Sequence, residues 1–380
     1  MTDPVMHVPY SYLKDQFADP EPILKAFRDQ LARCEFTFGP ELTEFEKKMA
    51  DYTGAKYCLG TSSGTMALSM LLRAVGVEPG DEVITVSQTF VATIGSIVTL
   101  YARPYFIDVT DDFTMDPAHI EKAITKKTKA IMPVHYSGQP AQMKHILEIA
   151  DRHRIPVIED ACCAISAKID GRHVGTFGTG GAFSVHPLKN LNVWGDGGFI
   201  ITNSSAMYEQ VLLLRNHGLK NRDEVDLFGY NARLDTIQAI VGNFLHPQID
   251  DITDKRIANA KKYDDALSAP ELSDFITLPP RRGNERHVYH MYMFLAEHRD
   301  RLLQYLIDRG IEAKVHYPIP MHLQKATLDQ KTPYPHSDLS ITEHQCKALI
   351  TLPVHQHLSA SHTGHVIDCI RKFYGDRLWK

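Results

Sequence analysis

The sequence predicts an α/β fold, in which a mainly parallel seven-stranded sheet forms a large domain and a smaller α+β domain follows at the C-terminus. Two observations carry this prediction. Short Val/Ile-rich runs alternate with helical stretches from Phe45 to about Ile201, and a Pro/Arg/Gly-rich hinge at Pro279 to Gly283 separates a different pattern beyond it. A chain of 380 residues is long enough for both domains, which we place at residues 1–245 and 246–380.

The predicted strands of the large domain are short apolar runs. They are YCLGTS, DEVITV, RPYFIDV, KAIMPVHY, IPVIEDA, GAFSVH and GFIITN. The stretches between them are amphipathic, because apolar residues recur at spacings of three and four from Thr65 to Val75 and from Met143 to Arg154. Strands separated by such crossovers form a parallel sheet with both faces buried.

The C-terminal part begins with a long helical region, roughly Leu234 to Leu267. After the hinge, the sequence predicts a strand in HVYHMYMFLAE (287–297), a helix at 299–310 and a strand at 311–317. A closing helix is expected from about Ser361 to Tyr374.

Composition and charge exclude several classes of protein. The chain is 43% hydrophobic and 23% charged, as in soluble globular proteins, and its net charge is −5 with Lys and Arg scattered, which argues against a nucleic-acid partner. The N-terminus shows no secretion signal, and the apolar stretch around Phe90 to Leu100 is too short to span a membrane. We therefore expect a cytoplasmic protein with no membrane partner.

Neither a disulfide framework nor a metal site is expected. The six cysteines lack paired C-x-x-C spacing, so they are expected to be reduced thiols. Four histidines cluster near the C-terminus, but no cysteine or carboxylate completes a known metal-binding spacing. They are His355, His357, His362 and His365.

Chemically distinctive residues follow four of the predicted strands, at the edge of the sheet where α/β proteins bind ligands. Gly64 and Thr65, in TSSGT, open a helix whose free N–H groups could bind a phosphate, although an ordinary helix cap explains them equally well. Asp160 ends a buried strand, where it could pair with a protonated pyridine nitrogen or cap the next helix.

An amine and an aromatic ring follow the other two strands. Lys189 follows the strand GAFSV and precedes a glycine-rich turn. Partial burial beside another cation would lower its pKa and make the amine nucleophilic, whereas the alternative is a solvated surface lysine. Phe90 could stack on a planar ring or be a core residue. Pyridoxal 5'-phosphate (PLP) requires four features of a protein. They are a phosphate-binding helix start, a carboxylate for its ring nitrogen, an amine for its aldehyde and an aromatic face for its ring.

The sequence also resembles the DegT/StrS-type sugar aminotransferases, a family of fold type I PLP-dependent enzymes. The resemblance runs nearly end to end and rests on ordered pieces of sequence: FTFGPELTEFE, TSSGTMAL, PVHYSGQPAQM, VIEDACCA, VGTFGTGGAFSVHPLKNLNVWGDGG, LRNHG, GYNARLDTIQA and HYPIPMH. It implies a PLP-dependent aminotransferase that moves an amino group from glutamate to a keto sugar, either nucleotide-linked or an oxidised octulosonic acid.

The resemblance also implies roles for individual residues. Lys189 would carry the cofactor as a Schiff base and shuttle the proton, and Asp160 would keep the pyridine nitrogen protonated. Gly64, Thr65 and Ser184 would bind the phosphate, while Phe90 would stack on the ring. Asn231, in GYNAR, would reach the phosphate of a neighbouring subunit, which implies a homodimer with shared active sites.

The chain departs from the family pattern near the expected site. Cys163 stands where Gln or His usually lies near the ring hydroxyl, and a thiol is a poor hydrogen-bond donor. Trp194 replaces a smaller residue beside the glycine turn. Trp194, Arg233, Tyr317 and His322 are candidates for lining the substrate site.

Two other functions are compatible with the same fold. One is a non-catalytic regulator, against which the presence of Lys189, Asp160 and Ser184 argues. The other is a fold type I enzyme acting on amino acids, for which an arginine clamp for the substrate carboxylate is expected. Neither Arg371 nor Arg377 lies in a motif of that kind.

Overall fold

The computed structural model describes residues 6–379. The first five residues lie outside the described residues. Part of the prediction about an N-terminal signal falls on them. Among residues 6–379, none of the helices combines the length and the apolar character that a membrane span needs.

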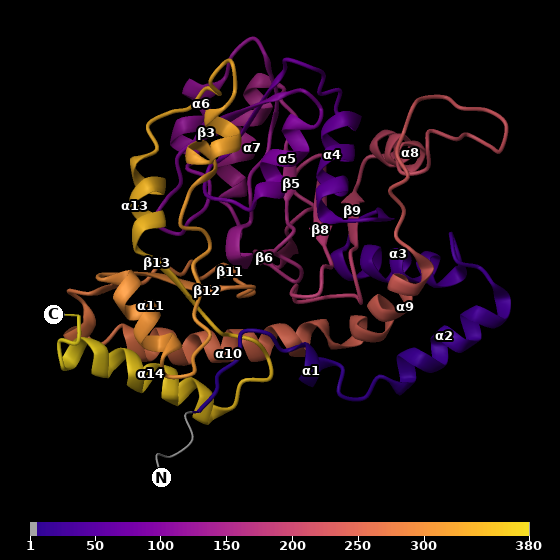
Figure 1. Ribbon diagram of the computed structural model, residues 1–380. Coiled ribbons are helices and arrows are strands. Elements are labelled where there is room, and N and C mark those ends of the chain that lie inside the picture. The colour runs from indigo at the N-terminus through magenta and orange to yellow at the C-terminus, as the bar shows by residue number, and fades with distance from the viewer. Residues whose placement is uncertain (1–5, 380) are drawn as a thin grey trace.

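Seven strands form the centre of the molecule, and each overlaps one of the predicted runs, with β4 and β8 beginning one residue earlier (Figure 1). They are β1 (Tyr57–Thr61), β2 (Glu82–Val86), β3 (Arg103–Ile107), β4 (Thr128–Ile131), β5 (Ile158–Asp160), β8 (Gly180–Ser184) and β9 (Gly198–Thr202). They pair in the orders β1-β9-β8-β5 and β3-β2-β4. Parallel bridges from Ile131 to Val157 and from Val134 to Asp160 connect the two groups. Only β9 runs antiparallel to its neighbours among these strands, so the mainly parallel α/β fold is confirmed.

Helices cover both faces of these strands. The helices that precede residue 246 are α1 (Leu13–Gln16), α2 (Glu21–Arg33), α3 (Pro40–Thr53), α4 (Gly64–Ala74), α5 (Val91–Val98), α6 (Ile120–Ala123), α7 (Met143–His153), α8 (Ser205–Leu214) and α9 (Thr236–Leu245). Along β9, Phe199 and Ile201 pack into the core formed with α3 and α9, whereas Ile200 packs against α4 and α8. This alternation follows from the period of two of a strand and explains why β9 is apolar on both sides.

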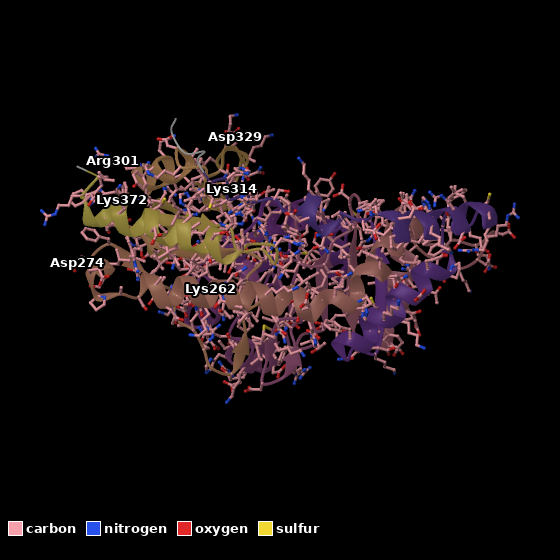
Figure 2. The ribbon with its side chains drawn as sticks, turned by 90° about the horizontal axis from the view of Figure 1, so that it is seen from below. Lys262, Asp274, Arg301, Lys314, Asp329 and Lys372 are labelled. Atoms are coloured by element: carbon pink, nitrogen blue, oxygen red, sulfur yellow. The ribbon has the colours of Figure 1, made fainter. Side chains whose placement is uncertain are left out.

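The C-terminal part contains the antiparallel sheet β10-β12-β13 and a layer of helices. The strands are β10 (Ile276–Thr277), β12 (Tyr292–Ala296) and β13 (Leu349–Leu352), and the helices are α10 (Ile249–Leu267), α11 (Arg299–Ile307), α12 (Lys325–Leu328), α13 (Ser340–Ala348) and α14 (Ala360–Gly375). Figure 2 shows α10 and α14 side by side, with labelled charged residues such as Lys262 and Lys372 on the outer surface. A separate three-stranded sheet joins β11 (Glu285–Arg286) to β6 (Lys168–Ile169) and β7 (Arg172–His173).

The long helical region is confirmed, as two helices, α9 and α10, separated by a 3-10 turn at His246–Gln248. Pro247 lies in that turn, and a proline cannot donate the backbone hydrogen bond that would continue α9. The strand expected at 311–317 does not form, because only Ile311 and Lys314 make single bridges, to Val8 and Thr351.

The boundary between the two domains stays a prediction. Helix α10 contributes to cores on both sides of it, since Ile249 packs with Phe45 and Leu245, whereas Tyr263 packs with Tyr292.

Candidate active site

The residues predicted from four strand exits meet at one edge of the sheet. Asp160 is the last residue of β5, Ser184 is the last residue of β8, and α4 begins three residues after β1 ends at Thr61. Strands β5 and β8 are parallel, with Asp160 opposite Ala182, so their carboxyl ends point the same way. This is the edge at which open α/β sheets bind ligands.

The start of α4 forms a tight cradle. The Ser63 hydroxyl caps the helix by accepting a 3.1 Å hydrogen bond from the Met66 N–H. The N–H groups of Gly64 and Thr65 belong to the first turn, where no carbonyl of the preceding turn is available to them. A Cβ on Gly64 would lie 2.7 Å from the Cys162 Sγ and 2.9 Å from the Ser184 Cβ. The Ser63 cap leaves these two N–H groups available, so the cradle fits a phosphate group, and the binding of phosphate there stays a prediction.

Asp160 is 4% exposed and is held by two donors. One carboxylate oxygen accepts from the Cys162 N–H at 3.1 Å, and the other accepts from the Thr93 hydroxyl at 2.7 Å. The first contact closes a local turn, and because residues 161–167 form no helix, the alternative that Asp160 caps the next helix is wrong. A carboxylate has about four acceptor positions, so Asp160 can still accept from a protonated ring nitrogen.

Lys189 is half-buried and not a solvated surface residue. Its Nζ lies 3.2 Å from the Cys163 Sγ and 3.4 Å from the His290 Nε2. Its backbone carbonyl accepts hydrogen bonds from the Tyr12 hydroxyl at 2.7 Å and from Asn192 at 3.1 Å. These contacts fix both ends of the lysine in the centre of the site.

The expected lowering of the Lys189 pKa by a neighbouring cation is wrong for the chain alone. Burial lowers the pKa, but Cys163, Cys162 and Asp160 raise it, so that the pKa of Lys189 lies above its ordinary value. Burial, and then Lys189 itself, hold the pKa of His290 well below the ordinary histidine value. His290 is therefore neutral at pH 7 and can accept a hydrogen bond from the Lys189 ammonium.

Phe90 lies at the start of α5 and is 52% exposed, so it is not a core residue. Its ring centroid is 5.9 Å from that of Tyr317. Burial, and then the neighbouring Cys163, raise the pKa of Tyr317, which therefore keeps its proton. The structure thus brings Phe90, Tyr317 and Cys163 into one region, with an aromatic face left open.

Arg233 and Asn231 lie close to the end of β1. Arg233 pairs with Thr61 and donates a 2.9 Å hydrogen bond to the Asn216 side chain. Asn231 pairs with Asn216 through the backbone and is exposed. Its contact with a neighbouring subunit stays a prediction.

The remaining two candidates have well-defined structural contacts. The Trp194 ring packs edge-on against Phe17 and Phe27, with centroids 5.4 and 5.6 Å away. The His322 ring lies between the Ser87 hydroxyl at 2.7 Å and Glu343 at 3.3 Å. Substrate contacts by either residue stay predictions.

Three residues around Lys189 and Asp160 were not predicted as site residues. Thr93 lies on α5, His290 precedes β12, and Tyr12 precedes α1. No short motif points to Tyr12 or Thr93. A weak signal exists for His290, because it is a polar residue inside the apolar run HVYHMYMFLAE.

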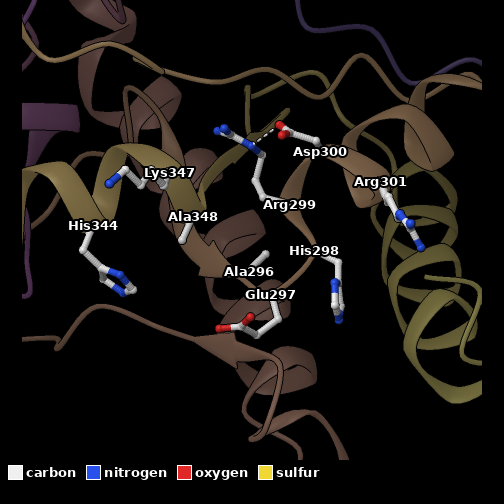
Figure 3. Close-up of a pocket in the computed structure, with 9 residues that line it drawn as sticks. All are labelled: Ala296, Glu297, His298, Arg299, Asp300, Arg301, His344, Lys347 and Ala348. Atoms are coloured by element: carbon white, nitrogen blue, oxygen red, sulfur yellow. Dashed lines mark hydrogen bonds and ion pairs between the residues drawn. The ribbon is translucent and has the colours of Figure 1, made fainter. Parts of the chain in front are cut away.

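A separate pocket is lined by the end of β12, the residues up to and including the first turn of α11, and the end of α13 (Figure 3). There Arg299 forms an ion pair with Asp300 at 2.6 Å. Within residues 6–379 there is no group of three or more His, Cys, Asp or Glu side chains that could hold a metal ion.

Comparison with known proteins places this geometry in a family. Residues 18–371 match the DegT/DnrJ/EryC1/StrS aminotransferase family. A pleiotropic regulatory protein of Geobacillus stearothermophilus is 38% identical over 97% of this chain and 99% of its own length. The dTDP-3-amino-3,4,6-trideoxy-alpha-D-glucose transaminase of Streptomyces venezuelae is 36% identical over 89% of this chain and 88% of its own length.

A solved structure shows the cofactor in a similar fold. The Bacillus subtilis protein NtdA, with bound PMP (the amine form of the cofactor), superposes with a TM-score of 0.90 at 29% identity, over 98% of this chain and 86% of the other. The chain therefore belongs to the DegT/DnrJ/EryC1/StrS aminotransferase family and is a PLP-dependent sugar aminotransferase.

Proposed function

We propose that the chain transfers an amino group from glutamate to a nucleotide-linked keto sugar, and that Lys189 is the catalytic residue. The observation that supports this most is that the Lys189 Nζ lies 3.2 Å from Cys163, three residues after the buried carboxylate of Asp160, while the neighbouring Cys162 faces Gly64. PLP, when bound, supplies a carbonyl carbon that exchanges an amino group and a ring that takes up an electron pair.

The residues of the chain divide the remaining work. Gly64, Thr65 and Ser184 hold the phosphate, and Asp160 keeps a proton on the ring nitrogen. In each half-reaction the Lys189 Nζ would move a proton between the substrate carbon and the cofactor carbon, away from the donor carbon first and later onto the acceptor carbon. Because His290 is neutral and 3.4 Å away, it can orient the Nζ without competing for its proton at pH 7. Phe90 covers one face of the ring.

The nature of the acceptor is supported by similarity. The name of the Streptomyces relative gives a dTDP-linked sugar with an amino group at position 3. We propose that this chain likewise accepts a nucleotide-linked 3-keto sugar. An oxidised octulosonic acid remains the alternative acceptor. Asn231 is exposed, as a residue that reaches a second subunit must be, and we propose a homodimer. A cytoplasmic location stays a prediction.

A non-catalytic regulator is the second candidate, because one relative is named a pleiotropic regulatory protein. A regulator has no need for a lysine 3.2 Å from a thiol in a site that also holds the buried carboxylate of Asp160, so the geometry favours the enzyme.

The deciding experiment is a half-reaction. The visible spectrum of the purified, PLP-loaded protein is recorded before and after addition of L-glutamate, beside a Lys189→Ala variant. We expect glutamate to convert the lysine-bound form of the cofactor to the amine form in the wild type only. A panel of keto sugars then identifies the acceptor that reverses the change. If no amino donor changes the spectrum, the proposed catalytic function is wrong.

A further inference from the structure

Arg256, on α10, is a buried cation without a counter-ion. It is 2% exposed, and none of the described Asp or Glu side chains forms an ion pair with it. Its Nε donates to the Gln356 side chain at 3.1 Å, and its Nη1 donates to the carbonyls of Tyr289 and His290 at 3.2 and 3.4 Å. Its Nη2 has no hydrogen-bond partner among the described residues.

The His290 ring has a similar unsatisfied nitrogen. Its Nε2 faces Lys189, and its Nδ1 is buried with no partner within the described part of the chain. When the Lys189 ammonium donates to Nε2, the single proton of the neutral ring must lie on Nδ1, which is then a donor. Each residue therefore keeps one donor group unused.

Both residues line the same small cavity. Its other lining residues are Tyr10, Tyr12, Leu188, Val354 and His355. Leu188 directly precedes Lys189, so the cavity lies next to the reacting amine. It has room for about one water-sized atom, so a single carboxylate oxygen fits it while the rest of the donor stays outside, and a sugar ring is excluded.

Physical chemistry favours an anion here. A guanidinium removed from water without a partner is destabilised, and an arriving carboxylate would compensate it with charge-assisted hydrogen bonds. Tyr12 cannot take this role as a phenolate, because burial raises its pKa. Its ring instead lies 4.9 Å from the guanidinium, as a cation–π contact that leaves Nη2 unsatisfied.

We propose that Arg256 and His290 form the subsite for a carboxylate of the amino donor. This deepens the proposed function and rests on it. The carboxylate could be the α-carboxylate or the side-chain carboxylate of glutamate, and both present the same chemistry to the two donors.

The test measures each half-reaction separately in the PLP-loaded protein. Arg256→Met removes the charge, and Arg256→Lys keeps it. We expect Arg256→Met to slow the reaction with L-glutamate on the order of 100-fold, as for loss of one partner of a buried ion pair, while the amine form still reacts with the keto sugar at nearly the wild-type rate. Arg256→Lys should recover part of the loss. Equal losses in both half-reactions, or no loss with glutamate, would overturn the subsite.

A comparison of donors identifies which carboxylate binds. If Arg256→Met slows L-glutamate and L-glutamine equally, the α-carboxylate occupies the site; if it slows only L-glutamate, the side-chain carboxylate does. Both outcomes support the proposal. Failure of every amino acid to react with the wild type would instead refute the proposed function.

Two measurements distinguish a binding role of Arg256 from a purely structural one. Glutarate, an unreactive dicarboxylate, should raise the melting temperature of the wild type but not of Arg256→Met. Arg299→Met is the matched control, because Arg299 is also buried and donates to a backbone carbonyl, that of Leu349 at 2.8 Å, in the pocket of Figure 3. It should lower stability and leave the glutamate half-reaction unchanged. If Arg299→Met slows that half-reaction as much as Arg256→Met, the effect is structural and the proposal fails.

Discussion

At the scale of single residues, the Asp160 carboxylate is held by a neighbour that lies far away in the sequence. The Thr93 hydroxyl donates to the carboxylate at 2.7 Å, and both residues are buried. Chemistry at Asp160 is therefore coupled to helix α5, which also presents Phe90 at its start.

Replacing Thr93 with valine should slow catalysis without unfolding the protein. Valine keeps the shape but removes a hydrogen bond to a charged group, which contributes about 1.5–3 kcal/mol, so we expect kcat to fall about tenfold or more. Steady-state kinetics with saturating substrates measure this. Thr363→Val, which removes a buried hydroxyl in α14, is the control and should leave kcat unchanged. An unchanged kcat in Thr93→Val would mean that this hydroxyl does not support Asp160.

At the scale of elements, the start of helix α4 combines an ordinary helix cap with the cradle proposed to bind phosphate. Ser63 caps it, as the sequence suggests, but Gly64 in its first turn is required by two tertiary neighbours, Cys162 in the turn after β5 and Ser184 at the end of β8. The sequence could predict where the helix starts. It could not predict that a methyl group at Gly64 would clash, because both clashing residues are more than 95 positions away.

Alanine substitutions at two helical glycines should therefore have opposite effects. Gly364→Ala, in α14, meets no atom within 4 Å and should raise the free energy of unfolding by about 0.5–1 kcal/mol through helix propensity. Gly64→Ala should lower the melting temperature and weaken PLP binding, because its Cβ would approach Cys162 to 2.7 Å. Thermal unfolding and a PLP titration of each variant test this. PLP binding as tight in Gly64→Ala as in the wild type would argue against the cradle.

At the scale of the whole molecule, the proposed sharing of sites between subunits can be tested by complementation. Lys189→Ala and Asn231→Ala each impair every site of their own homodimer. In a mixed dimer, one site combines the intact Lys189 of one subunit with the intact Asn231 of the other. Unfolding and refolding the two variants together should restore about a quarter of wild-type activity, because random pairing gives one native site in every four. If activity does not recover although mixed dimers form, Asn231 acts within its own subunit.

The pH dependence of stability is also a property of the whole fold. Burial lowers the pKa of His173, His316 and His355 to about 4. In the unfolded chain these histidines take up protons near pH 6.5, whereas in the folded chain they stay neutral until about pH 4. Stability is thus fully present above pH 6.5 and is lost as the pH falls toward 4.

Denaturant unfolding at pH 7 and pH 5 tests this behaviour. We expect each of the three histidines to contribute a loss on the order of 1 kcal/mol between these values. His355→Gln should reduce the loss, whereas the exposed His145→Gln should not. A loss that is identical in both variants would show that His355 is not a source of the acid sensitivity.

The sequence by itself determined the seven short strands, most helices, the family, and the set of Asp160, Lys189, Gly64 and Ser184, because alternating apolar runs and residues at strand ends are local patterns. Only the tertiary structure decided what surrounds them. Tyr12, Thr93 and His290 are between 67 and 177 positions from the residues that they contact in the site, and Arg256 is 34 positions from His290. Contacts over such separations depend on how the elements pack, as does the pKa of Lys189, which is raised by neighbouring thiols and a carboxylate that no local pattern places there.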